Sequence, residues 1–129
     1  MAYLWVAIGG ALGSVGRFWL NGVVSRSFGE TFPWGTMVIN VTGSFTIGLL
    51  MTLFTERYQP HTNLRLLLVT GFLGGYTTFS SFSLQTLNLL RDREWIYAGG
   101  NILLSVLLCM VAAGLGHLCG TMLDSVKGS

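Results

Sequence analysis

Hydrophobic residues occupy four long stretches of this chain, and three short polar segments separate them. The stretches cover residues 2–24, 34–55, 66–90 and 95–123. Each is long enough for a transmembrane helix, which needs about 20 predominantly apolar residues. The pattern predicts an all-α integral membrane protein with four transmembrane helices, and it places residues 1–129 in a single domain.

The third stretch combines poor helix formers with hydroxyl groups. Three glycines lie within five positions and are followed by a hydroxyl-rich run: Gly71, Gly74 and Gly75, then Thr77, Thr78, Phe79, Ser80, Ser81 and Phe82. Non-helical backbone inside a membrane is tolerated where it lines a cavity or is buried in protein. We therefore expect a helix broken in mid-membrane, with carbonyls free to bind a cation and donors free to bind an anion. An equally weighted alternative is a small-residue face that only packs helices.

Polar residues in the second and fourth stretches repeat every four positions, so each set shares one helix face. The sets are Thr36, Asn40 and Ser44, and Asn101, Ser105 and Cys109. Asn40 is the informative member, because an amide in hydrocarbon is costly unless it is hydrogen-bonded. It provides either donors for a permeant ion or a bond between helices. Phe79 and Phe82 also share a face, which the fourth-stretch residues are placed to meet.

The charged residues narrow the possible functions. Only 9% of residues are charged, against about 25% in soluble chains. The formal charge of +2 is too small to indicate a nucleic-acid partner. Arg17 is the only charge well inside an apolar stretch. It either reaches the headgroups from a helix end or attracts anions at a pore vestibule.

Other residues give no sign of catalytic chemistry. The connections are too short for a soluble catalytic domain, and no nucleophile–base–orienter set is present, so the protein is not expected to be an enzyme. Cys109 and Cys119 are interpreted as buried apolar residues, and His117 as an interface residue.

Lysine and arginine show no bias between the two sides of the predicted topology. One side carries Arg57, Arg65 and Lys127, and the other carries Arg26, Arg91 and Arg93, with Arg17 leaning that way. A chain without such a bias should insert both ways. Two opposed copies would then form an antiparallel homodimer, which brings two Gly74–Thr77 breaks together near the midplane. Paired carbonyls there are suited to a small cation such as Na⁺.

Three segments of the sequence carry a resemblance to a known family. They are residues 71–83 (GFLGGYTTFSSFS), 35–43 (GTMVINVTG) and 13–17 (GSVGR). The chain closely resembles the CrcB/Fluc family of fluoride channels in these motifs, and in its length and four-span layout.

The resemblance implies that a dual-topology homodimer in the cell inner (plasma) membrane exports fluoride passively from the cytoplasm through two pores. It implies an aromatic box of Phe79 and Phe82 and a donor at Asn40. It also implies a structural Na⁺ on the Gly74 and Thr77 carbonyls. The family's polar track corresponds to Thr36, Thr78, Ser81 and Ser105. Gln85 stands where many members have Glu.

Two other functions compete with a fluoride channel. A small dual-topology multidrug exporter needs an acidic residue within the membrane, whereas all five acids here are expected in loops or the tail. A non-transporting assembly subunit would use its glycines only to pack helices. It predicts that Asn40, Phe79 and Phe82 can be replaced without functional loss.

Overall fold

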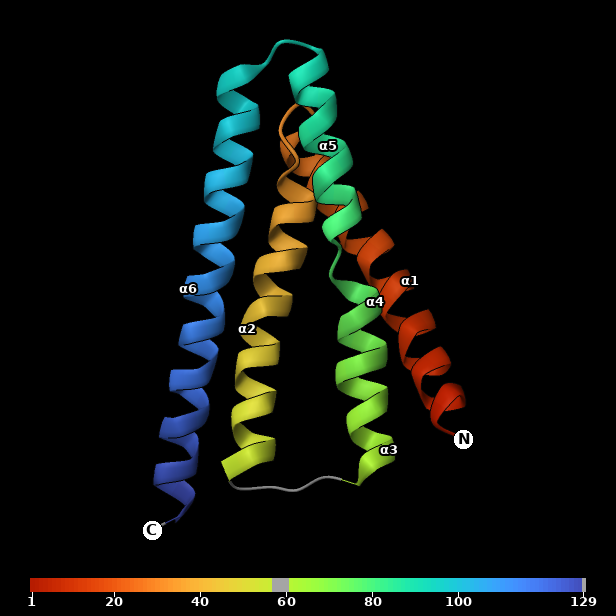
Figure 1. The fold of residues 1–129 in the computed structure, drawn as a ribbon, viewed down its shortest axis with the longest axis vertical. Coiled ribbons are helices and arrows are strands. Elements are labelled where there is room, and N and C mark those ends of the chain that lie inside the picture. The colour runs from red at the N-terminus through yellow and green to blue at the C-terminus, as the bar shows by residue number, and fades with distance from the viewer. Residues whose placement is uncertain (57–60, 129) are drawn as a thin grey trace.

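The computed structural model describes residues 1–56 and 61–128, and these form helices with no strand among them (Figure 1). The first two helices are α1 (Ala2–Phe28) and α2 (Trp34–Glu56). The third arm is composite, with α3 (Thr62–Arg65), the π-helix η1 (Leu66–Leu73), α4 (Gly74–Tyr76) and α5 (Phe79–Arg91). The last helix is α6 (Trp95–Gly128). The predicted all-α class is confirmed.

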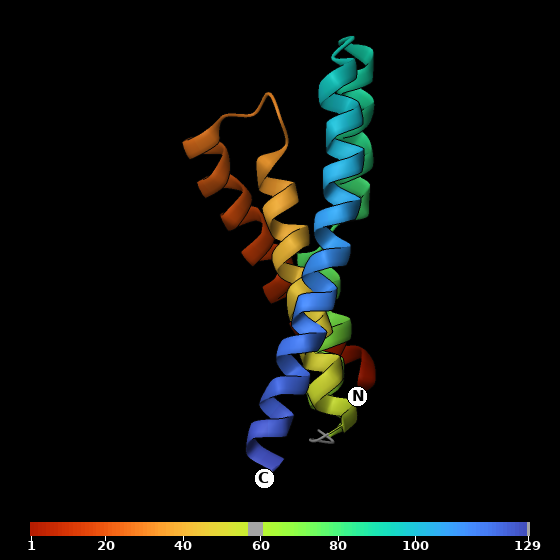
Figure 2. The same cartoon turned by 90° about the vertical axis from the view of Figure 1, so that its left-hand side faces the viewer.

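The four long helical segments, called arms below, are α1, α2, the composite α3–α5 and α6, and they pack in two pairs. Helix α2 runs along α6, while α1 crosses η1 and α4. Both chain termini lie at the same end of the molecule, as Figure 1 shows. The α1–α2 hairpin and the α5–α6 hairpin diverge towards the other end (Figure 2). The interrupted third arm therefore packs on α1 through η1 and α4, and on α6 through α5.

The outer surface of the molecule is apolar. Two helical stretches are long and apolar enough to cross a bilayer, Trp34–Phe54 with 21 residues and Trp95–Leu123 with 29. Only 28% and 17% of their most apolar windows are buried. The core helix of a soluble protein would be mostly buried, whereas a membrane helix presents its apolar side chains to lipid. This arrangement is typical of a membrane protein.

The glycines of the third arm are helical and serve close packing. A Cβ on Gly71 would lie 2.9 Å from Gly9 Cα, and one on Gly75 would lie 2.7 Å from Gly10 O. Both atoms belong to the backbone of α1, which cannot shift to make room as a flexible side chain could. Small residues permit such close approach between membrane helices. The packing interpretation of the glycines is therefore correct for Gly71 and Gly75.

Helical backbone is interrupted after these glycines rather than at them. Gly74 has helical angles (φ −61°, ψ −38°), whereas Thr77 (ψ 156°) and Thr78 (φ −151°) are extended. Helix α5 then begins at Phe79, where Thr78 Oγ1 caps it by accepting from Ser81 N. The expected break at Gly74–Thr77 therefore overlaps the observed one only at Thr77, because glycine costs helix stability but does not by itself end a helix and Gly74–Tyr76 stay helical.

The helix ends also differ from the expected boundaries. Helix α1 continues to Phe28 and ends at the following residue, Gly29, which takes a positive φ of 83°. Helix α6 continues through residue 124, so Asp124 lies in a helix rather than in a tail. The segment with Arg57 and Pro60 lies outside the described residues.

Candidate functional site at the interrupted helix

Asn40 replaces the helical hydrogen bonds that Thr78 lacks. Its Oδ1 accepts from Thr78 N at 2.8 Å, and its Nδ2 donates to Thr78 O at 2.9 Å. The amide orientation follows from the partners, because a backbone N–H can only donate and a carbonyl can only accept. Asn40 therefore holds the extended backbone much as a neighbouring strand would. One N–H of its amide has no partner among the described residues.

Two further contacts hold the backbone just before the interruption. The Tyr76 hydroxyl lies 2.7 Å from Thr42 Oγ1, which itself donates to Val38 O. Since the threonine hydrogen is already used, the tyrosine is the donor. Arg17 Nε donates to Gly75 O at 3.1 Å, near the carbonyl end of α4 where a cation is favourable. Residues from α1 and α2 thus fix residues 75–78.

The interruption leaves the Gly74 carbonyl of α4 without its usual helical donor. In a continuous helix Thr78 N would donate to Gly74 O, but here it donates to Asn40. Thr77 N and Thr77 Oγ1 both donate to Leu73 O, at 3.0 and 2.9 Å. Gly74 O consequently accepts no hydrogen bond from the described part of the chain, and Gly74 is exposed.

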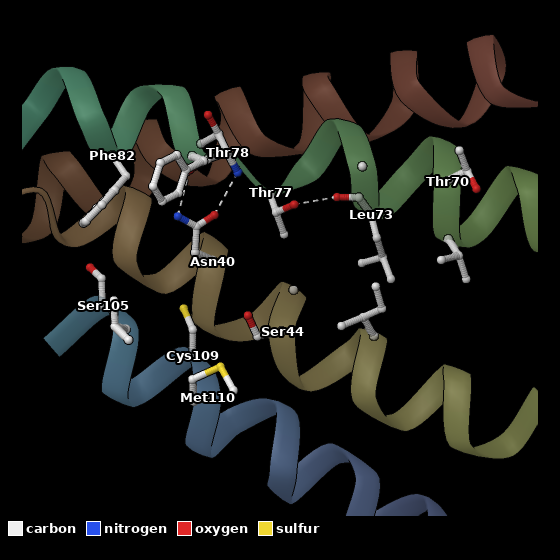
Figure 3. A pocket seen from close by; sticks show the side chains of 16 residues that line it. Asn40, Ser44, Thr70, Leu73, Thr77, Thr78, Phe82, Ser105, Cys109 and Met110 are labelled. Atoms are coloured by element: carbon white, nitrogen blue, oxygen red, sulfur yellow. Dashed lines mark hydrogen bonds between the residues drawn. The ribbon is translucent and has the colours of Figure 1, made fainter. Parts of the chain in front are cut away.

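A cavity of about 490 Å³ lies between the interruption, α2 and α6 (Figure 3). Most of the predicted site residues line it. They are Asn40, Gly74, Thr77, Thr78, Phe79, Phe82 and Ser105. Figure 3 places Asn40 beside Thr78 at one end, close to Phe82 and Ser105, and Thr70 at the other end.

The two phenylalanines form an aromatic pair at this cavity. The Phe79 and Phe82 ring centroids are 5.3 Å apart, and the rings are tilted by 46°. Phe79 is 76% exposed although its ring is large and apolar. The positive edge of an aromatic ring attracts anions without carrying a charge. The pair therefore offers an anion contact that the chain leaves uncovered.

A second cavity of about 220 Å³ lies on the α1 side of the interruption. Its polar residues are Ser14, Arg17, Asn21, Thr36, Thr78, Ser81 and Gln85. Thr78 lines both cavities, so the extended backbone borders each of them. Gln85 Oε1 is buried without a hydrogen-bond partner among the described residues.

The described residues that line the two cavities carry one charge, which is positive. It belongs to Arg17, and no acidic residue is among the described residues that line either cavity. Three of the five acids, Glu30, Asp92 and Glu94, lie in connections between helices. Such a lining favours an anion over a cation.

One residue of the predicted fourth-stretch set lies elsewhere. Asn101 is 1% exposed and lines neither cavity, whereas Ser105 and Cys109 line the first. Cys109 and Cys119 are both unpaired and half-buried. His117 bonds Thr52 through Nδ1 at 2.7 Å.

Sequence reasoning missed several residues of the site. Thr42 and Tyr76 hold the interruption, and Asn21 lines the second cavity. Asn21 follows Arg17 by four positions, so helical spacing gave a signal for it. The Thr42–Tyr76 contact left no such signal, since it joins two arms.

These observations define a helical membrane protein whose uncharged donors, aromatic rings and single cation gather around an interrupted helix. Such an arrangement is typical of channels and transporters, in which non-helical backbone lines an ion pathway.

Comparison with known proteins identifies the family. The family described as "CrcB-like protein, Camphor Resistance (CrcB)" matches residues 4–117. A protein of Opitutus terrae is 58% identical over 129 residues, covering 98% of both chains. Others from Methylocella silvestris (50% identical, all of both chains) and Rhodospirillum rubrum (45%, 96% of this chain and 98% of the other) are similar. All three are named "Fluoride-specific ion channel FluC". The chain belongs to the CrcB-like protein family.

Proposed function

We propose that this protein is a fluoride-selective passive ion channel of the inner (plasma) membrane, which exports fluoride from the cytoplasm. The observation that carries the proposal is the lining of uncharged donors and phenylalanine rings around Asn40, in which the described residues include no acid. The names of the family's closely similar members support it. Passive conduction requires no catalytic group.

The chemistry of the lining suits a small, strongly hydrated anion. An ion that loses water needs replacement donors, and the remaining N–H of Asn40 and the hydroxyls of Thr36, Thr78 and Ser81 offer them. Phe79 and Phe82 add ring edges that attract the ion without a fixed countercharge. The ion must bind weakly enough to leave again, which a fully charged site would hinder. Arg17 would raise the anion concentration in the second cavity, the vestibule of this proposal.

The working unit is an antiparallel homodimer in which each chain crosses the membrane four times and the interruption lies in mid-membrane. The exposure of several residues supports pairing with a second copy of the chain. Phe79 and Gly74 are exposed beside the first cavity, and α6 exposes large apolar side chains. Two copies would form two equivalent pathways. Protease treatment of intact spheroplasts should remove a C-terminal tag from about half of the chains. Removal from all chains or from none would exclude dual topology.

A structural Na⁺ is part of the proposed dimer. Gly74 O fits this role because its usual donor is bonded to Asn40, and carbonyl oxygens suit hard cations. The Gly74 and Thr77 carbonyls of both copies would hold the ion at the symmetry axis. When bound it would neutralise these dipoles and join the chains. Replacing Na⁺ with a large organic cation should weaken the dimer, whereas an unchanged dimer with full fluoride flux would exclude the site.

Protection of cells tests the function. Bacteria without their own fluoride exporters should grow in fluoride when they express this chain. They should not grow when they express a Phe79→Ile, Phe82→Ile double variant. Phe28→Ile is a suitable control, because Phe28 lies at the end of α1 away from both cavities and is 69% exposed. Equal protection by the double variant would favour the assembly-subunit alternative.

A multidrug exporter is the weaker alternative. It needs an acidic group in the substrate path, and within the described part of the chain none of the residues lining the two cavities supplies one.

A further inference from the structure

A chain of three hydrogen bonds connects α6 to the backbone of Phe82. Ser105 Oγ donates to Asn101 Oδ1 at 3.1 Å, and Asn101 Nδ2 donates to Thr86 Oγ1 at 2.9 Å. Thr86 Oγ1 donates in turn to Phe82 O at 2.8 Å. Ser105 and Phe82 line the first cavity, whereas the two residues between them do not.

The direction of each bond follows from the number of hydrogens available. The Thr86 hydroxyl has one hydrogen, which it gives to Phe82 O, so it must accept from Asn101. The Asn101 amide then has its nitrogen towards α5 and its oxygen towards Ser105. Asn101 is 1% exposed and Thr86 is 8% exposed, so water does not compete for these groups.

These three hydrogen bonds act on the first turns of α5. Helix α5 begins at Phe79, directly after the extended backbone, and Phe82 lies one turn further along. A threonine that bonds the carbonyl four residues earlier shifts the local backbone direction. Fixing Thr86 from α6 therefore fixes the rotation of α5, and with it the direction in which the Phe82 ring meets the cavity.

We propose that Asn101 and Thr86 are positioning residues that set the Phe82 ring for ion contact through the bond between Thr86 Oγ1 and Phe82 O. The proposal rests on the proposed channel function for its effect on flux. It also explains why Asn101, an amide within an apolar helix, faces α5 rather than the cavity. Ser105 spends its only hydrogen on this chain, so it presents an acceptor to the cavity as long as the bond to Asn101 is kept.

The protein contains a matched control for this chain of hydrogen bonds. Thr52 is 7% exposed, donates to Gly48 O at 2.8 Å and bonds His117 of α6 at 2.7 Å. It thus makes the same two kinds of contact as Thr86 but lines neither cavity. Thr86→Val and Thr52→Val remove the same atoms at equal burial, so a purely structural role predicts equal effects.

The test measures fluoride efflux from liposomes over a range of fluoride concentrations. Thr86→Val should lower the maximal flux about tenfold, the scale expected when a buried donor loses its partner. Thr86→Ser, which keeps the hydroxyl, should restore the flux to near that of the parent. Thr52→Val should leave flux unchanged while lowering the thermal midpoint of the dimer as much as Thr86→Val does.

A second measurement does not depend on flux. 4-Fluorophenylalanine placed at Phe82 should give one ¹⁹F resonance in the parent and the Thr52→Val protein, and a shifted or broadened one in Thr86→Val. Equal flux losses in the two valine variants, no recovery in Thr86→Ser, or an unchanged ¹⁹F spectrum would each overturn the positioning role. If the parent itself released no fluoride, the proposed function would fail, and the ¹⁹F comparison would still decide the positioning role.

Discussion

Replacing Asn40 with aspartate tests the centre of the site most sharply. The introduced carboxylate can still accept from Thr78 N, but it cannot donate to Thr78 O, which now lies 2.9 Å from the bonded nitrogen. The change therefore loses one hydrogen bond, worth about 1 kcal/mol. It also brings two acceptors together at the extended backbone.

The larger effect is on the ion itself. At an effective dielectric constant of about 20, a carboxylate and a fluoride ion about 4 Å apart repel by about 4 kcal/mol. This corresponds to a loss of about 10³ in the occupancy of the site, since about 1.4 kcal/mol is tenfold. Fluoride efflux from Asn40→Asp should therefore fall to the background of empty liposomes.

The assay follows fluoride release from liposomes with a fluoride-selective electrode, alongside the elution volume of the purified dimer. Asn63→Asp is the control, because it makes the same change in α3 at a residue that lines neither cavity. It should retain most of its flux. Efflux from Asn40→Asp within about twofold of the parent, with the dimer intact, would refute the proposed role of Asn40.

Three other substitutions have expected outcomes. Gly13→Ala should abolish the folded protein, because the added Cβ would collide with Phe72 O and lie 2.9 Å from Tyr76 N. The control Gly99→Ala, whose Cβ meets nothing within 4 Å, should fold normally, and equal dimer yields from the two variants would contradict this packing. Arg17→Ala should lower fluoride flux about tenfold, because Gly75 O loses its donor, and added methylguanidinium should restore part of the flux. Full flux from Arg17→Ala in the absence of methylguanidinium would count against the role of this contact. Arg93→Gly should raise the free energy of unfolding by about 1 kcal/mol, because Arg93 has a positive φ of 60° that glycine adopts without strain. The thermal midpoint should therefore rise, and a lower midpoint would contradict this reasoning.

Much of the site could be predicted from the sequence because its residues follow local periodicity. The four-residue spacing placed Asn40 and Ser44 at one cavity, and the three-residue spacing brought Phe79 and Phe82 to within 5.3 Å. Hydroxyl residues after glycines indicated irregular backbone, and extended residues occur at Thr77 and Thr78.

The remaining features depend on contacts between arms that are distant in the sequence. The interruption lies at Thr78 because Asn40, 38 positions away, supplies the bonds that a helix would have made. The glycines do not mark this point, since Gly71 and Gly75 are needed against α1. Asn101 follows the same spacing as Ser105, but its burial against Thr86 removes it from the cavity. Spacing along one helix does not reveal which neighbour a side chain will meet.

The central claim is tested most directly by ion release from liposomes that contain the purified parent protein. Vesicles loaded with fluoride should release it rapidly down its gradient, with no proton gradient imposed, while matched chloride-loaded vesicles should retain their chloride. Fluoride release that requires an opposing proton gradient would indicate an exchanger and contradict passive conduction. Release of both anions would contradict selectivity, and no release from well-folded dimers would contradict the channel function itself.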